Sequence, residues 1–276
     1  MDRRNFIGVS AAALGAARLL PLARTIPTGR LDRIGVQLYT LRAAMERDFE
    51  GSLARVAKIG YRDVEFAGYF GHSARDVRTI LDRHGLRAPA AHISTETIRG
   101  NWEQTLADAQ TIGHEYLVCA WINDADRTHE GYEAIANEFN RAANTALSSF
   151  VGFAYHNHVY EFKPLADGHV PYDSLLGDTD PSLVKFEIDL FWMIEAGHDP
   201  LAYFAKYPGR FPLLHVKDRD AAGKMADVGR GTIDFRTIFA RANAAGVRHV
   251  FVEHDEPADP FASIEASYRY LRDLRF

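Results

Sequence analysis

Ionisable side chains stand at the ends of four successive apolar segments in the C-terminal half of the chain. They are Glu161, Asp189, His215 and Glu253, and each follows a short run of β-branched and aromatic residues. Carboxylate and imidazole groups gathered in this way suit a bound divalent cation, because one ion offsets the cost of burying like charges together. We expect Mn²⁺, with Co²⁺, Mg²⁺ and Zn²⁺ as alternatives, since these oxygen and nitrogen donors fit hard or borderline ions.

Two residues compete for the first ligand position. His156 lies closer than Glu161 to the expected strand end, so it is an alternative ligand or a general acid or base. Lys217 follows His215 by two residues and therefore shares its face of the strand, where an ammonium group can stabilise negative charge on a substrate oxygen. Glu161, Glu253, His156 and Lys217 are thus the catalytic candidates.

Other polar and aromatic side chains near strand ends are candidates for contact with a substrate. The candidates for direct contact are Gln37, His92, His158, Trp192 and Arg230. Additional aromatic residues could pack in the core or form an apolar wall for a sugar ring, namely Phe66, Tyr69, Phe70, Trp121 and Phe191.

A glycine-rich stretch, Val228 to Asp234, also needs an interpretation. It lacks the Lys-Ser/Thr pair of a phosphate-binding P-loop. We expect a turn that closes the mouth of the site, with Asp234 as the N-cap of the helix that begins at Phe235.

The elements that must position these residues alternate between short strands and longer helices from Arg33 onward. The expected strands are Ile34–Tyr39, Asp63–Phe66, Ala88–His92, Tyr116–Ala120, Gly152–His156, Val184–Asp189, Leu213–Val216 and His249–Glu253. The expected helices are Phe49–Ile59, Ala74–His84, Trp102–Ile112, Tyr132–Ser148, Tyr172–Leu176, Pro200–Lys206, Phe235–Ala245 and Pro260–Leu271.

Eight strand and helix units predict a single-domain α/β fold, the (β/α)8 TIM barrel, whose strand ends all meet at one mouth. An open doubly wound sheet is the competitor. It is disfavoured because the first turn, Tyr39 to Arg42, has no G-x-G-x-x-G pattern.

The composition and net charge of the chain limit the classes of partner that it could bind. The chain has 276 residues and a net charge of −5 with no basic stripe, so we expect no nucleic acid as a partner. Cys119 is the only cysteine, which excludes an internal disulfide. Nothing in the composition indicates an oligomeric state.

The N-terminus predicts export. Arg3 and Arg4 precede an Ala/Leu/Gly run that ends at Leu22, the order found in a twin-arginine signal. We assign residues 1–28 to this signal and 29–276 to the barrel. A periplasmic or exported protein follows, with no stable membrane insertion after the signal is removed.

Five segments together resemble the sugar phosphate isomerase/epimerase family of xylose-isomerase-like TIM barrels. They are Tyr155–Phe162 (YHNHVYEF), Phe186–Trp192 (FEIDLFW), His215–Asp218 (HVKD), Val228–Phe235 (VGRGTIDF) and Val252–Pro257 (VEHDEP). The resemblance implies that Asp189, His215 and Glu253 hold a divalent ion. In this H-N-H-x-x-E-F variant it gives the first ligand position to Glu161, while His156 stands where many relatives have glutamate.

The resemblance implies a metal-dependent isomerase or epimerase. Such an enzyme would abstract a proton next to the carbonyl of a keto-sugar or sugar derivative and pass through a metal-bound enediolate. A lyase that acts on a 3-keto-glycoside or dehydrates a keto-inositol is the alternative, as is a non-catalytic sugar-binding barrel. A multi-zinc endonuclease of this fold would need additional His ligands and a basic groove, and neither is evident.

Overall fold

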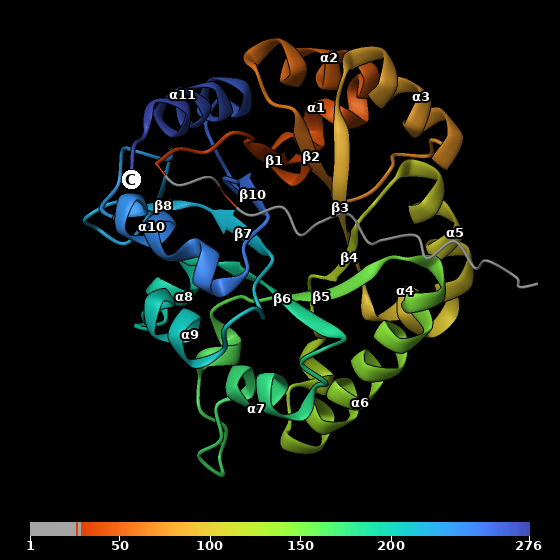
Figure 1. The fold of residues 1–276 in the computed structure, drawn as a ribbon, viewed down its shortest axis with the longest axis vertical. Helices are drawn as coiled ribbons and strands as arrows, with labels where there is room; N and C mark the ends of the chain where they lie inside the picture. The colour runs from red at the N-terminus through yellow and green to blue at the C-terminus, as the bar shows by residue number, and fades with distance from the viewer. Residues whose placement is uncertain (1–25, 27–28) are drawn as a thin grey trace, which may run out of the picture.

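Eight short strands close into a parallel barrel in the computed structural model, which describes residue 26 and residues 29–276 (Figure 1). The strands are β1 (Gly35–Gln37), β2 (Asp63–Phe66), β3 (Arg87–Ile93), β4 (Tyr116–Cys119), β5 (Gly152–His156), β6 (Val184–Asp189), β7 (Leu213–Val216) and β10 (His249–Val252). Around the barrel they run in chain order, and β10 pairs with β1 to close it. The expected (β/α)8 fold is confirmed. The export signal assigned to residues 1–28 lies, apart from residue 26, outside the described residues.

Helices surround the barrel and shield the outer faces of its strands (Figure 1). The long ones are α2 (Phe49–Ile59), α3 (Ala74–His84), α5 (Trp102–Ile112), α6 (His129–Ala146), α7 (Pro171–Asp178), α9 (Pro200–Lys206), α10 (Phe235–Ala245) and α11 (Pro260–Asp273). In α6 the buried residues recur at helical spacing, for example Tyr132, Ile135, Ala136 and Phe139. Gly85 and Gly246 end α3 and α10 at φ of 64° and 86°, a left-handed conformation that glycine adopts without a Cβ clash.

Several short elements were not expected from the sequence. They are the helices α1 (Arg42–Arg47), α4 (Thr95–Gly100) and α8 (Leu190–Glu195), the 3₁₀ turns Leu38–Leu41, Asp124–Asp126, Leu147–Ser149 and Tyr160–Phe162, and an antiparallel ribbon of β8 (Asp218–Arg219) and β9 (Met225–Ala226). Each is too short to give a clear hydrophobic period. Of the helices in the described part of the chain, none combines the length and apolar character needed to cross a membrane.

Alternation along the strands divides the apolar core in two. In β7, Leu214 and Val216 point outward to the large core shared with the helices, whereas Leu213 points into the barrel. The inner cluster comprises Ala90, Tyr116, Val118, Ala154, Leu213 and Phe251. These side chains form an apolar floor inside the barrel. On each strand, the next residue that points inward lies two positions further towards the mouth, above this floor.

Candidate metal centre and active site

The polar side chains of the site occupy those inward positions above the apolar floor. Two residues beyond Leu213 comes His215, and two residues beyond Phe251 comes Glu253. The same period places Glu187 and Asp189 on one face of β6, and His156 above Ala154 on β5. Because every second residue of a strand points into the barrel, these ionisable side chains meet at its mouth.

Asp189, His215 and Glu253 come together as the sequence predicted. One donor atom from each lies within 4.8 Å of the others, and all three side chains are buried. Nδ1 of His215 is 2.7 Å from Oε2 of Glu253 and 4.0 Å from Oδ2 of Asp189. His156 also reaches this group, because its Nε2 is 3.8 Å from the same Asp189 oxygen.

Asp189 has a separate task for each of its carboxylate oxygens. Oδ1 accepts a hydrogen bond from the backbone N–H of Trp192 at 3.0 Å and so caps helix α8. Oδ2 is buried and accepts no hydrogen bond. Asn157 fixes the residue in place, since its Oδ1 accepts the Asp189 N–H at 3.0 Å and ties the ends of β5 and β6 together. Oδ2 therefore faces the cluster, where the ammonium group of Lys217 lies 3.1 Å away.

Lys217 supplies positive charge at the same position. Its Nζ lies 3.1 Å from Oδ2 of Asp189, 2.8 Å from Oε2 of Glu253 and 2.8 Å from Oδ1 of Asp255. The ammonium group is buried, so its attraction to the three carboxylates is weakly screened. These carboxylates thus converge on a point that already accommodates a cation.

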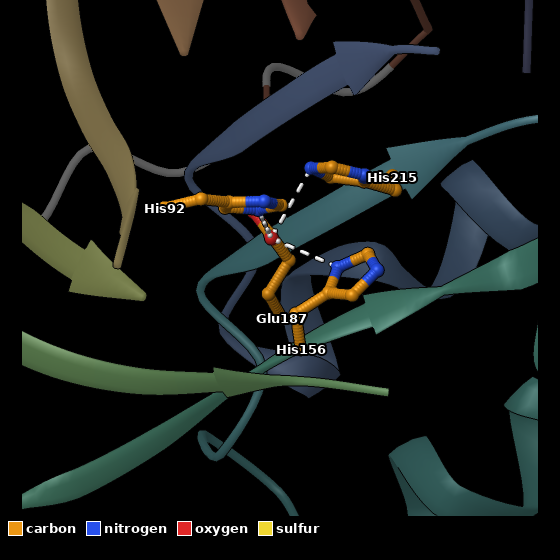
Figure 2. Close-up of side chains that lie close together, drawn as sticks. All are labelled: His92, His156, Glu187 and His215. Carbon is orange, nitrogen blue, oxygen red and sulfur yellow. Dashed lines mark hydrogen bonds and ion pairs between the residues drawn. The ribbon is translucent and has the colours of Figure 1, made fainter. Parts of the chain in front are cut away.

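A second cluster lies deeper in the barrel and shares two imidazoles with the first (Figure 2). Figure 2 shows Oε2 of Glu187 surrounded by three histidines, 2.9 Å from Nε2 of His92, 3.1 Å from Nδ1 of His156 and 3.1 Å from Nε2 of His215. Glu65 joins them with an oxygen 2.5 Å from Nε2 of His215. Hence His156 and His215 each direct one ring nitrogen to a deep carboxylate and the other towards Asp189.

Burial and charge together set the protonation states. Burial acts to raise the pKa of Glu253, but Lys217 and His215 hold it well below its usual value. Burial also raises the pKa of Asp189, to about 6, against the opposing effect of Lys217. For His215 burial acts to lower the pKa, and the surrounding carboxylates, led by Glu187, raise it well above the usual value. Glu253 is therefore an ionised carboxylate and can accept a proton.

His156 and His158 have the opposite character. Burial lowers the pKa of His156 well below its usual value, and burial together with the charge of Lys217 lowers that of His158 to about 3. Both are neutral imidazoles near pH 7. Nδ1 of His158 is buried without a hydrogen-bond partner.

Glu161 lies apart from the other three residues expected to bind the metal. Its carboxylate accepts hydrogen bonds from the hydroxyl of Tyr155 and from the backbone N–H of His158, the latter at 2.9 Å. Tyr155 belongs to the large outer core, on the opposite face of β5 from His156. Glu161 therefore does not join the three other residues at the mouth, and burial raises its pKa to about 7.

The candidates for substrate contact divide in a similar way. A cavity of about 870 Å³ opens above the cluster, and His92, His158 and Trp192 line it together with Lys217 and Glu253. Nε1 of Trp192 is buried without a hydrogen-bond partner. The cavity is of a size that binds small organic ligands.

Gln37 and Arg230 do not line this cavity. Gln37 is buried and donates to Glu65 at 2.9 Å, so its role is to position that carboxylate. Arg230 is 72% exposed, and its nearest acidic group is Asp227, 3.9 Å away.

The glycine-rich stretch is a turn, and its amide groups have a partner within the chain. Oδ2 of Asp218 accepts the backbone N–H groups of Gly229 and Gly231 at 2.8 and 2.9 Å, and Oδ1 accepts that of Ile233 at 3.2 Å. A carboxylate therefore takes the position that a phosphate would need. The expected N-cap is confirmed, because Asp234 accepts the N–H of Thr237.

Sequence reasoning missed Glu187, which lies in the middle of a strand rather than at its end. Two-residue alternation from Asp189 would have placed it inside the barrel. The role of Asn157 in joining two strand ends had no comparable signal, because it depends on how β5 and β6 pair at His156 and Glu187.

Comparison with known proteins agrees with this architecture. Two curated relatives are inosose dehydratases: that of Geobacillus thermodenitrificans is 26% identical over 271 residues and that of Clostridium beijerinckii 22% over 273, each match covering 83% of this chain and 90% of the relative. A solved sugar phosphate isomerase/epimerase of Parabacteroides distasonis is 28% identical with a TM-score of 0.76, covering 86% of this chain and 96% of that one. The model of the xylose isomerase-like TIM barrel family matches residues 53–274, which include all three of Asp189, His215 and Glu253. The chain therefore belongs to the xylose isomerase-like TIM barrel family.

Proposed function

We propose that this protein is a divalent-metal-dependent lyase that removes the proton next to the carbonyl of a keto-sugar and then eliminates a neighbouring oxygen substituent. The observation that carries the proposal is the convergence of Asp189, His215 and Glu253 beneath a cavity of about 870 Å³.

Four side chains would hold the ion. Oδ2 of Asp189, Nδ1 of His215, Oε2 of Glu253 and Nε2 of His156 face one another, and Oδ2 of Asp189 already has a cation, the Lys217 ammonium group, 3.1 Å away. Two imidazoles and two carboxylates fit Mn²⁺, Co²⁺ or Zn²⁺, whereas Mg²⁺ prefers oxygen ligands alone. When bound, such an ion polarises a carbonyl oxygen and acidifies the adjacent C–H group.

The chain's own residues then have distinct tasks. Glu253 is ionised and lines the cavity, so it can take the proton from carbon. Lys217 keeps the local charge balanced and can donate a hydrogen bond to a substrate oxygen that becomes negative. His158 and Trp192 line the cavity and would contact the sugar.

Two observations favour elimination over isomerisation. A two-glutamate mechanism would need a second glutamate free to face the substrate opposite Glu253. Glu161 is bonded to Tyr155 and to the His158 amide, and Glu65 and Glu187 are held by histidines deeper in the barrel. In addition, both curated relatives described above are named as dehydratases, enzymes that eliminate water. Isomerisation or epimerisation, the first expectation from the sequence, is the second candidate, favoured by the name of the solved relative at 28% identity.

The test is to incubate metal-loaded protein with keto-sugars, keto-inositols and 3-keto-glycosides in deuterated water and to follow the products by NMR. Loss of the substituent next to the acidic carbon would establish elimination, whereas deuterium in an unbroken sugar would indicate isomerisation or epimerisation. Glu253→Gln should abolish both, provided that its metal content is matched to wild type. Absence of any exchange across the panel would refute the proposal.

The N-terminal pair Arg3-Arg4 bears on where in the cell the protein acts. We infer export through the twin-arginine route, which would present the enzyme with free or glycosidic sugars rather than phosphorylated ones. Changing both arginines to lysine should retain the protein in the cytoplasm. Unchanged export of that variant would contradict the assignment.

A further inference from the structure

The cavity above the metal-ligand cluster is larger than one sugar ring requires. Its volume of about 870 Å³ lies towards the upper end of the roughly 300–1,000 Å³ that drug-sized ligands occupy. A monosaccharide is much smaller than such a ligand. If the reacting sugar lies over Asp189 and Glu253, the remaining space must be filled by water or by another part of the substrate.

Trp121 lies on the wall of this remaining space. It directly follows Cys119 and Ala120 at the end of β4, and 45% of its surface is exposed although it is one of the largest apolar side chains. Tryptophan is seldom left this open without a reason, because burying its rings contributes strongly to stability. Trp121 is one of the residues that line the cavity.

Neighbouring side chains hold Trp121 in one position. The guanidinium carbon of Arg127 is 4.5 Å from the centre of the indole ring and 3.5 Å from the centre of the Tyr160 ring. Arg127 is itself fixed, because it donates to the carbonyl of Ile122 at 3.0 Å and pairs with Asp124 at 2.8 Å. The Tyr160 hydroxyl accepts the N–H of Ile122 at 3.1 Å.

This arrangement forms a rigid aromatic platform, which we define as Trp121, Arg127 and Tyr160. Its loop is cross-linked by hydrogen bonds before any ligand arrives, so little conformational entropy remains to be lost on binding. The cation beneath the indole also strengthens the platform, since Arg127 is attracted to the electron-rich faces of both rings.

The platform lies one side chain away from the reacting position. The ring centre of His158 is 5.1 Å from that of Trp121 and 5.0 Å from that of His156. His158 thus separates the platform from the metal-ligand cluster by about the width of one ring. A group attached directly to the reacting sugar would reach Trp121 without leaving the cavity.

We propose that the Trp121 platform binds a second ring joined to the reacting sugar. This proposal rests on the proposed function, which gives the position of that sugar. The substrate is then a glycoside whose attached group presents a flat face, rather than a free monosaccharide. An aromatic ring and the C–H face of a second sugar share the chemistry that stacks on indole. The test therefore includes both.

The experiment measures binding of unreacted glycosides to metal-loaded protein by calorimetry. For each of several hexoses, the methyl glycoside is compared with the phenyl glycoside and with a disaccharide that carries the same hexose. We expect the phenyl glycoside, the disaccharide or both to bind about tenfold more tightly than the methyl glycoside, as one good stacking contact allows. Which of the two gains more identifies the attached group.

Variants then assign the gain to the platform. Trp121→Ala should remove the preference over the methyl glycoside, and Trp121→Phe should restore part of it and guard against a folding defect. Phe150→Asn is the matched control, because Phe150 is 67% exposed, lies outside the cavity and has φ of 55°, which asparagine tolerates. It should keep the full preference.

The outcomes separate this proposal from the proposed chemistry. No preference for a second ring with any hexose, or a preference that survives in Trp121→Ala, would overturn the platform. Solvent deuterium exchange by wild-type protein tests the chemistry by itself. Its absence alongside a Trp121-dependent preference would refute the lyase and leave the platform standing.

Discussion

Nζ of Lys217 lies 2.8 Å from Oε2 of Glu253, with both side chains buried. An ammonium group thereby occupies the neighbourhood in which a divalent ion would bind the same oxygen. Burial alone would lower the pKa of Lys217, but Asp189, Glu253 and Asp255 raise it well above the usual value. The lysine therefore stays charged and stabilises the carboxylates without a metal.

Removing that charge should make the stability of the protein depend on metal. In Lys217→Met, the side-chain volume is nearly kept, but Asp189 and Glu253 lose their buried cation. Breaking a buried ion pair in this way costs about 3–5 kcal/mol. We expect most of this loss in metal-free protein and a much smaller loss in metal-loaded protein, measured by chemical unfolding with chelator and with Mn²⁺. Lys163→Met, at an exposed position, is the control. An equal loss in both states would mean that Lys217 does not substitute for the ion.

A second prediction distinguishes the two candidates for the first ligand. His156→Ala removes the Nε2 atom that lies 3.8 Å from Asp189, so it should weaken Mn²⁺ or Zn²⁺ binding at least tenfold in a competition titration. Glu161→Gln should leave the dissociation constant within about twofold, because Glu161 contacts Tyr155 and the His158 amide on the other face. The reverse order of effects would restore Glu161 as a ligand.

The contrast between these residues shows what the sequence could and could not reveal. Asp189, His215 and Glu253 were predictable because they lie on or directly after strands, where two-residue alternation fixes the direction of a side chain. Glu161 lies in a 3₁₀ turn, Tyr160–Phe162, that folds the chain back towards Tyr155. No period governs such a turn, and only the packed structure determines where its carboxylate points.

The barrel itself was the most predictable feature. Four strands and five helices, among them β2 and α3, have the same limits as expected from the sequence. Helix α8 was missed although its N-cap is Asp189, because the sequence indicated a ligand at that residue and the capping role is carried by its other oxygen. The sequence therefore indicated only one of the two roles of Asp189, the ligand role, and not its role as the N-cap of α8.

Glu187 leads to a third prediction. Its Oε2 accepts from rings on both sides, 3.1 Å from Nδ1 of His156 and 3.1 Å from Nε2 of His215, so it orients both imidazoles whose other nitrogens face Asp189. Glu187→Gln should weaken metal binding by about 10–100-fold, the usual effect of losing a carboxylate behind a ligating histidine. The measurement is the metal dissociation constant, with the exposed Glu103→Gln as control. Unchanged affinity would show that the rings are held by other contacts.

The opposite end of the barrel provides the last prediction, which concerns pH and stability. Burial acts to raise the pKa of Asp63, but its contact with His249 at 3.8 Å and its hydrogen bonds with Arg87 lower it from the ordinary 3.8 to about 2. A lowered folded-state pKa means that the carboxylate stabilises the fold above pH 4 and that this contribution is lost as the pH falls towards 2. The shift corresponds to about 2 kcal/mol.

In urea unfolding, Asp63→Asn should therefore lose about 2 kcal/mol relative to wild type at pH 6, and the difference should shrink as the pH approaches 2. Asp82→Asn removes an exposed carboxylate that pairs with Arg78 and should cost less than 1 kcal/mol. A loss for Asp63→Asn that is independent of pH would mean that packing, rather than the ionised carboxylate, stabilises this end of the barrel.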